Sequence, residues 1–186
     1  MRENADQYLA HLDTIFNVEP RYFLHSKEDE YPPFYSFTYR DIPEKGLITG
    51  ITSGVSFVEQ PGGGNVRPEL MICVDTTDDL WVLALASIGY QHRGEYRFEL
   101  GDTINFNAKI SKESDMSSFL VWHQSLIHED QEIVCLPDWH IKFLQLFPVH
   151  DDERLLIHKH GPEWLFEVVD DPCDVKRKSV AYKFKK

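Results

Sequence analysis

The chain has 186 residues, of which 42% are hydrophobic and 13% aromatic. This length suits one domain, or one domain with a small appendage. The apolar content is enough for a full core, which excludes disorder of the whole chain. The formal net charge is −12. A surface this acidic repels phosphate backbones and anionic lipid, so binding to nucleic acid or to a membrane surface is disfavoured. It is typical of a soluble protein and would also attract a basic partner.

Charge and cysteine usage indicate the compartment. Charged residues begin at Arg2, and no apolar core of a signal peptide follows. No apolar run approaches the roughly 18 residues that a membrane span needs. The three cysteines, Cys73, Cys135 and Cys173, are far apart and form no CxxC pair. Neither a disulfide framework nor a zinc cage is predicted, and a cytoplasmic location is expected.

The first half of the chain predicts one helix and several strands. Apolar residues at helical spacing mark the helix, namely Tyr8, Leu9, Leu12, Ile15 and Phe16. The prolines in residues 31–39 disfavour helix, and the alternation after them indicates extended chain. Residues 47–58 and 69–74 are rich in strand-forming types and predict an antiparallel hairpin. The residues between them, 61–65, form a flexible glycine-rich connection.

The second half alternates helices and strands. A helix with its apolar face over residues 80–88 follows the capping residues Asp78 and Asp79. Strands are predicted at 103–110, 118–122, 133–136 and 140–149. The acidic run 151–153 begins another helix, and residues 163–169 form a further helical piece. The polar, basic tail 170–186 is predicted to be loosely held.

The order of these elements predicts the fold class. Because the strands occur in consecutive groups, an α+β fold with a mixed or mostly antiparallel central sheet and packed helices is expected. Residues 1–30 would form the N-terminal helix and connection, residues 31–169 the main domain, and residues 170–186 a C-terminal tail.

Motifs for phosphate or metal chemistry are weak. The glycine run 62–64 lacks the Lys-Ser/Thr ending of a phosphate-binding loop, so a flexible hairpin loop is the better interpretation. Among nine histidines, His158 and His160 point to different faces of a helix, whereas His150 and Glu153 share one. No HExxH or three-histidine pattern occurs. No metal and no cofactor are predicted.

Catalytic arrangements are equally poorly supported. Ser53 precedes a glycine within residues 50–54, but the spacing is not GxSxG, and a strand-edge turn fits better. Glu69 with Asp102 is the carboxylate pair on which a hydrolase would depend, although nothing fixes a nucleophile or an oxyanion hole. The aromatic stretch 31–39 lacks interleaved Arg or Lys, which favours a core or protein-contact role over base stacking.

Several short sequence phrases, taken in order, resemble the Suppressor of fused (SUFU) family, especially its compact bacterial members. They are residues 33–43, 49–56, 67–70, 98–104, 143–146 and 171–175. The resemblance covers about residue 34 to residue 175 and identifies residues 31–169 as a SUFU-like domain. It implies helices around a central sheet and a non-enzymatic role.

The resemblance also implies a mode of binding. Eukaryotic members of the family hold a short peptide of a transcription factor as an added strand, a mode in which main-chain hydrogen bonds supply affinity and side-chain pockets supply specificity. Tyr90 and Asp102 match positions that contact this peptide, and the strand holding Phe143 and Gln145 matches the one that flanks it. Alternatively, Gly101 and Asp102 form a generic turn before a strand.

These patterns together predict a protein-binding module rather than an enzyme. Many bacterial relatives are thought to be immunity proteins of polymorphic toxin systems, so the resemblance implies binding and neutralisation of a toxin domain. A regulatory or scaffold protein that binds a peptide segment is the alternative, and a carboxylate-dependent hydrolase is the third reading. The free protein is expected to be a monomer. Because only a short tail follows residue 169, binding on one exposed face is expected rather than a clamp between two lobes.

Overall fold

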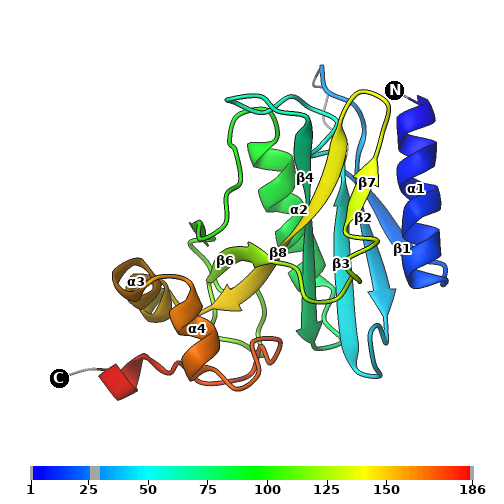
Figure 1. The fold of residues 1–186 in the computed structure, drawn as a ribbon. Coiled ribbons are helices and arrows are strands. Elements are labelled where there is room, and N and C mark those ends of the chain that lie inside the picture. The colour runs from blue at the N-terminus through cyan, green and yellow to red at the C-terminus, as the bar shows by residue number, and fades with distance from the viewer. Residues whose placement is uncertain (1, 26–29, 185–186) are drawn as a thin grey trace.

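One mixed sheet forms the centre of the computed structural model, which describes residues 2–25 and 30–184 (Figure 1). Its strand order is β1-β2-β3-β4-β8-β6-β5, and β7 pairs with β8 off this path. The strands are β1 (Arg21–His25), β2 (Phe34–Arg40), β3 (Leu47–Ser53), β4 (Val66–Asp75), β5 (Thr103–Asn105), β6 (Ser118–His123), β7 (Ile133–Cys135) and β8 (His140–Val149). Only the β4–β8 pair is parallel among the pairs of the described chain. The predicted mixed, mostly antiparallel sheet is therefore confirmed.

Helices cover both faces of this sheet. They are α1 (Arg2–Phe16), α2 (Leu80–His92), α3 (Asp151–His160) and α4 (Glu163–Val168), followed by a short 3-10 helix at Ala181–Phe184. In Figure 1, α1 lies along the side of β1 to β3, and α3 and α4 lie at the other end of the sheet, beyond β6 and β8. None of the helices in the described residues has the length and apolar character to cross a bilayer.

Strand alternation divides the core into two layers. Because successive strand residues face opposite sides, Leu70, Ile72 and Val74 of β4 pack with α2, whereas Met71 faces the layer beneath α1. Tyr8 of α1 is fully buried there and donates a 2.8 Å hydrogen bond to the Thr52 carbonyl oxygen. A third cluster joins β6 and the end of β8 to α3 and α4. The sheet is thus covered by different helices at its two ends.

The strand predicted at residues 47–58 ends at Ser53 instead. The carboxylate of Glu69 on β4 is fully buried and accepts hydrogen bonds from the backbone N–H groups of Gly54 and Ser56, at 2.9 and 3.0 Å. Thr52 and Ser56 donate their hydroxyls to the same carboxylate, at 2.6 and 2.7 Å. These bonds replace ladder pairing, so the chain turns away after residue 53.

Two edge strands also differ from the prediction. β1 was not expected, because its sequence has three consecutive apolar residues, Tyr22, Phe23 and Leu24, in place of polar–apolar alternation. The strand predicted at residues 103–110 is limited to Thr103–Asn105. Asn107 has a positive φ of 61°, which breaks the extended conformation soon after Asn105.

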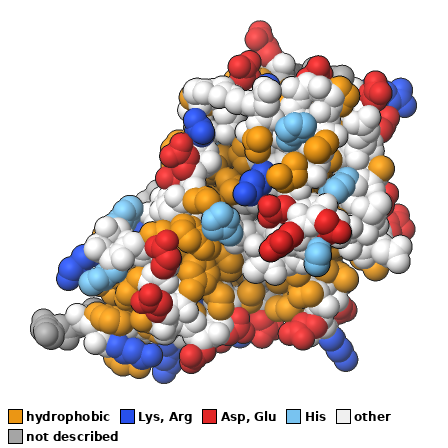
Figure 2. Space-filling model, viewed as in Figure 1, with side chains coloured by type: hydrophobic (Ala, Val, Ile, Leu, Met, Phe, Trp, Pro, Cys, Tyr) orange, Lys and Arg blue, Asp and Glu red, His pale blue; other side chains and the backbone are white. Residues whose placement is uncertain are grey.

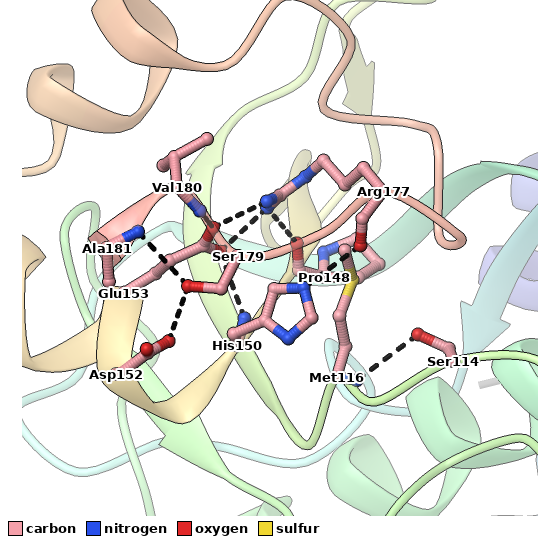
Figure 3. Close-up of polar contacts among 10 residues, drawn as sticks. All are labelled: Ser114, Met116, Pro148, His150, Asp152, Glu153, Arg177, Ser179, Val180 and Ala181. Carbon is pink, nitrogen blue, oxygen red and sulfur yellow. Dashed lines mark hydrogen bonds and ion pairs between the residues drawn. The ribbon is translucent and has the colours of Figure 1, made fainter. Parts of the chain in front are cut away.

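The predicted loose tail is instead packed against the domain (Figure 3). Val175 is fully buried in the α2 layer. Arg177 forms an ion pair with Glu153 of α3 at 2.6 Å, and the Val180 N–H donates to the same carboxylate at 2.8 Å. The Ser179 hydroxyl donates to Asp152 at 2.7 Å. The expectation of looseness was wrong because it rested on polarity alone, while these polar groups bond to Glu153, which is buried, and to Asp152 of α3.

Candidate protein-binding edge of the sheet

The short strand β5 lies at the open end of the sheet, next to β6. The Val121 N–H donates to the Asp102 carbonyl, and the Phe106 N–H to the Ser117 carbonyl, both at 2.8 Å. In an antiparallel ladder, hydrogen-bonded and non-hydrogen-bonded pairs alternate. The backbone groups of Thr103 and Asn105 are therefore directed away from β6. This edge is the kind of template to which a further strand adds.

Helix α3 contacts one face of β5 through the side chains of that strand. Thr103 is hydrogen-bonded through its hydroxyl to the His158 ring at 2.7 Å. The Asn105 side-chain amide donates to Asp151 at 2.9 Å. On the opposite face, Ile104 packs against the α2 layer. The strand is thus fixed on both faces, which holds its outer edge in a defined position.

Asp102 lies in the turn that leads into β5. Its carboxylate accepts a 2.7 Å hydrogen bond from the Glu99 N–H and a further one from the Tyr96 hydroxyl. Burial, the bond to Asp102 and the nearby negative charges raise the pKa of Tyr96 to about 12. Gly101 has a φ of 92°, which this turn requires and which other residues rarely adopt. Beside the turn, Tyr96 and Leu100 are exposed.

Tyr90 belongs to a different group of contacts. Its ring packs edge-on against Phe34 at 5.6 Å, and the Arg93 guanidinium lies 4.5 Å from its centroid. Arg93 in turn donates to the Pro32 carbonyl at 2.7 Å. Tyr90 is half-buried at the end of α2. Tyr90 and Asp102, which the family resemblance places at the peptide, therefore have separate surroundings. The tyrosine that contacts Asp102 is Tyr96.

The side chains of Phe143 and Gln145 are both fully buried. Phe143 stacks near Tyr8 with ring centroids 6.2 Å apart, and Gln145 accepts hydrogen bonds from Ser125 at 3.1 and 3.3 Å. β8 also has β4 on one side and β6 and β7 on the other. Their expected contact with a partner is corrected accordingly, because neither side chain reaches the surface.

The carboxylate pair proposed for a hydrolase is not assembled. Glu69 on β4 is separated from β5 by β8 and β6, which places the two strands roughly 14 Å apart at the usual strand spacing. Burial raises the pKa of Glu69, while hydrogen bonds from Thr52, Gly54 and Ser56 oppose this rise. Glu69 therefore holds the turn after β3, and Asp102 holds the turn before β5. In the described part of the chain, no three His, Cys, Asp or Glu side chains converge as metal ligands would.

A second surface is visible on the face drawn in Figure 2. Hydrophobic side chains gather there over α3, α4 and the neighbouring end of the sheet, with acidic side chains among them. Trp122, Phe166 and Val168 are among the partly buried members of the cluster beneath it. Phe166 packs edge-on against the buried Phe147 at 5.0 Å. This surface was not expected from the sequence.

Residues 30–178 match the family model of the Suppressor of fused protein (SUFU). The chain belongs to the SUFU family. It is 23% identical over 150 residues to the immunity protein YqcF of Bacillus subtilis (strain 168), an alignment that spans 75% of this chain and 78% of that protein.

Solved SUFU structures have the same fold. A SUFU homologue from Neisseria gonorrhoeae FA 1090 superposes with a TM-score of 0.75 at 21% identity, covering 96% of this chain and 97% of that one. A chain of the Sufu–Fu complex superposes with a TM-score of 0.74 at 15% identity, covering 97% of this chain and 93% of that one. Drosophila Suppressor of fused gives 0.71 at 15% identity, with 97% of this chain matched to 52% of that one. This SUFU chain thus spans about half of the Drosophila protein.

Proposed function

We propose that this chain is a non-enzymatic immunity-type protein that binds and neutralises a toxin domain through the open edge of β5. The observation that carries the proposal is its similarity to an immunity protein over three quarters of its length. The backbone groups of Thr103 and the Asn105 N–H, which are directed away from β6, support the location. The Asn105 carbonyl already accepts a 3.3 Å bond from the Asn107 side-chain amide, which an added strand would displace. We place the protein in the cytoplasm, as a monomer before it binds.

The surroundings of β5 fit a protein partner. The exposed side chains of Tyr96 and Leu100 supply apolar contact area next to the strand edge. Asp102 and Glu99 add negative charge, and the chain as a whole carries −12, so a basic partner is favoured. A strand of the partner would bond to the β5 backbone, while its side chains pack against Tyr96 and Leu100.

A regulatory protein that binds a peptide segment is the second proposal. It is supported by the shared fold with a chain of the Sufu–Fu complex, in which a SUFU protein is bound to another protein. The two functions would use the same edge but differ in the consequence for the partner. A toxin domain arrests growth when it is free and loses this activity when it is bound. A regulated partner does not arrest growth in either state.

The test is a native pull-down with mass spectrometry, followed by a growth assay in which the captured domain is expressed with or without this chain. Asp102→Arg reverses the charge at β5, and Asp102→Asn keeps an oxygen for the Glu99 N–H. Asp6→Arg makes the same reversal at an exposed position of α1 and is the matched control.

The toxin proposal expects the captured domain to arrest growth and expects wild type and Asp6→Arg, but not Asp102→Arg, to restore it. Capture of a domain that is harmless on expression would instead favour the regulatory function. If a folded Asp102→Arg variant protects as well as wild type, the β5 location is wrong while the neutralising function stands.

A further inference from the structure

Two cysteines that are 100 positions apart in the sequence meet beside β4. The pairing of β4 with β8 ends at Met71 and Gln145, so the last residues of β4 are no longer paired with β8, which continues to Val149. The C-terminal segment takes up this position, and the Asp75 N–H donates to the Cys173 carbonyl at 2.9 Å. Cys73 thereby lies next to Cys173.

The thiols of this pair are in direct contact. The Cys73 and Cys173 side chains are hydrogen-bonded to each other, and the Thr49 side chain bonds to Cys73 as well. Cys73 is 5% exposed, whereas Cys173 is half-buried at the surface. The pair thus has one buried sulfur and one that a small molecule in solution can approach.

The segment that carries Cys173 is anchored on its C-terminal side. Val175 is fully buried two residues later, and Arg177 is fixed by its ion pair with Glu153. Before Cys173, Asp171 accepts a 2.8 Å hydrogen bond from the Cys173 N–H. These contacts hold the two sulfurs together without a covalent bond.

We propose that Cys73 and Cys173 form an oxidation site, at which hydrogen peroxide converts the two thiols into an intramolecular disulfide. The bond would join the C-terminal segment covalently to the centre of the sheet. The proposal goes beyond protein binding, and it does not depend on the β5 edge or on the identity of a partner.

The chemistry balances with one peroxide molecule. The Cys173 sulfur, which peroxide can approach, attacks one peroxide oxygen as the thiolate, the O–O bond breaks, and the proton lost by Cys173 leaves with the other oxygen as water. The Cys73 sulfur then attacks the resulting sulfenic acid, the S–O bond breaks, and the hydroxyl departs with the Cys73 proton as a second water. Two thiols are oxidised and one peroxide is reduced.

The exposure of the two sulfurs suits this order. Cys173 is the half-buried sulfur that peroxide can approach, whereas Cys73 is only 5% exposed. The contact with Cys173 lowers the pKa of the Cys73 thiol, which favours its thiolate, the nucleophile of the second step. Cys73, already in contact, is the resolving thiol.

The test starts from Cys135→Ser, which removes the exposed third cysteine and prevents links between molecules through it. The reduced protein is treated with hydrogen peroxide, quenched and unfolded, and its free thiols are titrated. Two titratable thiols before treatment and none after it are expected, with a peptide map that links the fragments of Cys73 and Cys173. Removal of either cysteine should abolish the link, and Cys173→Ser, at the more exposed position, is the safer of these two variants for folding.

The cross-link also has a physical readout. A disulfide that closes so long a loop restricts the unfolded chain, so the thermal midpoint should rise by about 10 °C and return to its starting value after reduction with dithiothreitol. The proposal is overturned if both thiols still titrate after treatment, if they are oxidised to sulfinic acids without a link, or if only links between molecules form.

Discussion

The Arg177 guanidinium lies 2.6 Å from the carboxylate of Glu153, whose side chain is fully buried. Glu153 accepts three further hydrogen bonds, two from the backbone N–H groups of His150 and Val180 and one from a second guanidinium nitrogen of Arg177. One carboxylate therefore ties the start of α3 to the C-terminal segment (Figure 3). Removal of its cation would leave a negative charge without a salt bridge in the interior.

Replacing Arg177 with Met should lower the free energy of unfolding by about 3–5 kcal/mol, because a buried carboxylate loses its charged partner. Urea denaturation at neutral pH measures this change. The double variant Glu153→Gln/Arg177→Met removes the stranded charge and should recover part of the loss. The losses in the free energy of unfolding of Glu153→Gln and of Arg177→Met can be added and compared with the loss in the double variant. If the sum equals the loss in the double variant, the two side chains are not energetically coupled.

The pH dependence of stability should carry a contribution from Glu69. Burial raises the pKa of this carboxyl in the folded protein above its ordinary value, so the folded state binds its proton more tightly than the unfolded chain does. The stabilising contribution is complete at pH values below the pKa of Glu69 in the unfolded chain, about 4.3. It is lost as the pH rises through the raised pKa of the folded protein. The stability of wild type relative to Glu69→Gln should therefore fall as the pH rises from about 4.3. Parallel stability curves for the two proteins would contradict the raised pKa.

The helices and most of the strands follow from local patterns in the sequence. The apolar spacing of Tyr8, Leu12 and Phe16 predicts α1, and all three are buried. The end of β3 is not local, because it depends on Glu69, which lies sixteen residues further along the chain than Ser53. A single sequence does not show which carboxylate will bind a distant turn.

The turn at Asp102 was predicted from the local Gly-Asp pattern, as the alternative to contact with a partner, and the structure has that turn. The contact of Asp102 with a partner stays a prediction. The buried positions of Phe143 and Gln145 were missed, although residues 143–149 are apolar except for Gln145, which is typical of a strand covered on both faces. The bond between Tyr96 and Asp102 gave no local signal, because it forms only when the turn closes.

Asp102→Asn should lower the pKa of Tyr96 from about 12 toward the ordinary value near 10, without reaching it. The variant removes the negative charge and weakens the hydrogen bond, while burial, which is the largest cause of the shift, remains. Subtracting the ultraviolet titration of Tyr96→Phe from that of the protein that retains Tyr96 isolates this tyrosine. An unchanged midpoint in the Asn variant would show that the Tyr96 hydroxyl does not bond to Asp102.

Tyr8→Phe should destabilise the protein by about 1–3 kcal/mol, because the buried Thr52 carbonyl loses the hydroxyl that donates to it at 2.8 Å. Its ring would still fill the space beside Phe143, so the loss should be smaller than the 3–5 kcal/mol typical of removing a large buried aromatic side chain, as in Tyr8→Ala. Guanidinium denaturation of the two variants measures both values. Equal losses would mean that packing of the ring contributes nothing beyond the hydrogen bond.

Association with the proposed basic partner should slow as salt is added. The chain carries −12, and charges that are not in direct contact are screened beyond about 8 Å at physiological ionic strength. Raising the salt from low to physiological concentration should therefore lower the association rate constant by roughly tenfold or more, while the dissociation rate changes less. Stopped-flow mixing with the purified partner measures both rates. Asp102→Asn should reduce the salt dependence if Asp102 borders the interface, and Asp6→Asn serves as the matched control. An association rate indifferent to salt would remove charge attraction from the proposal and leave the β5 edge as its remaining basis.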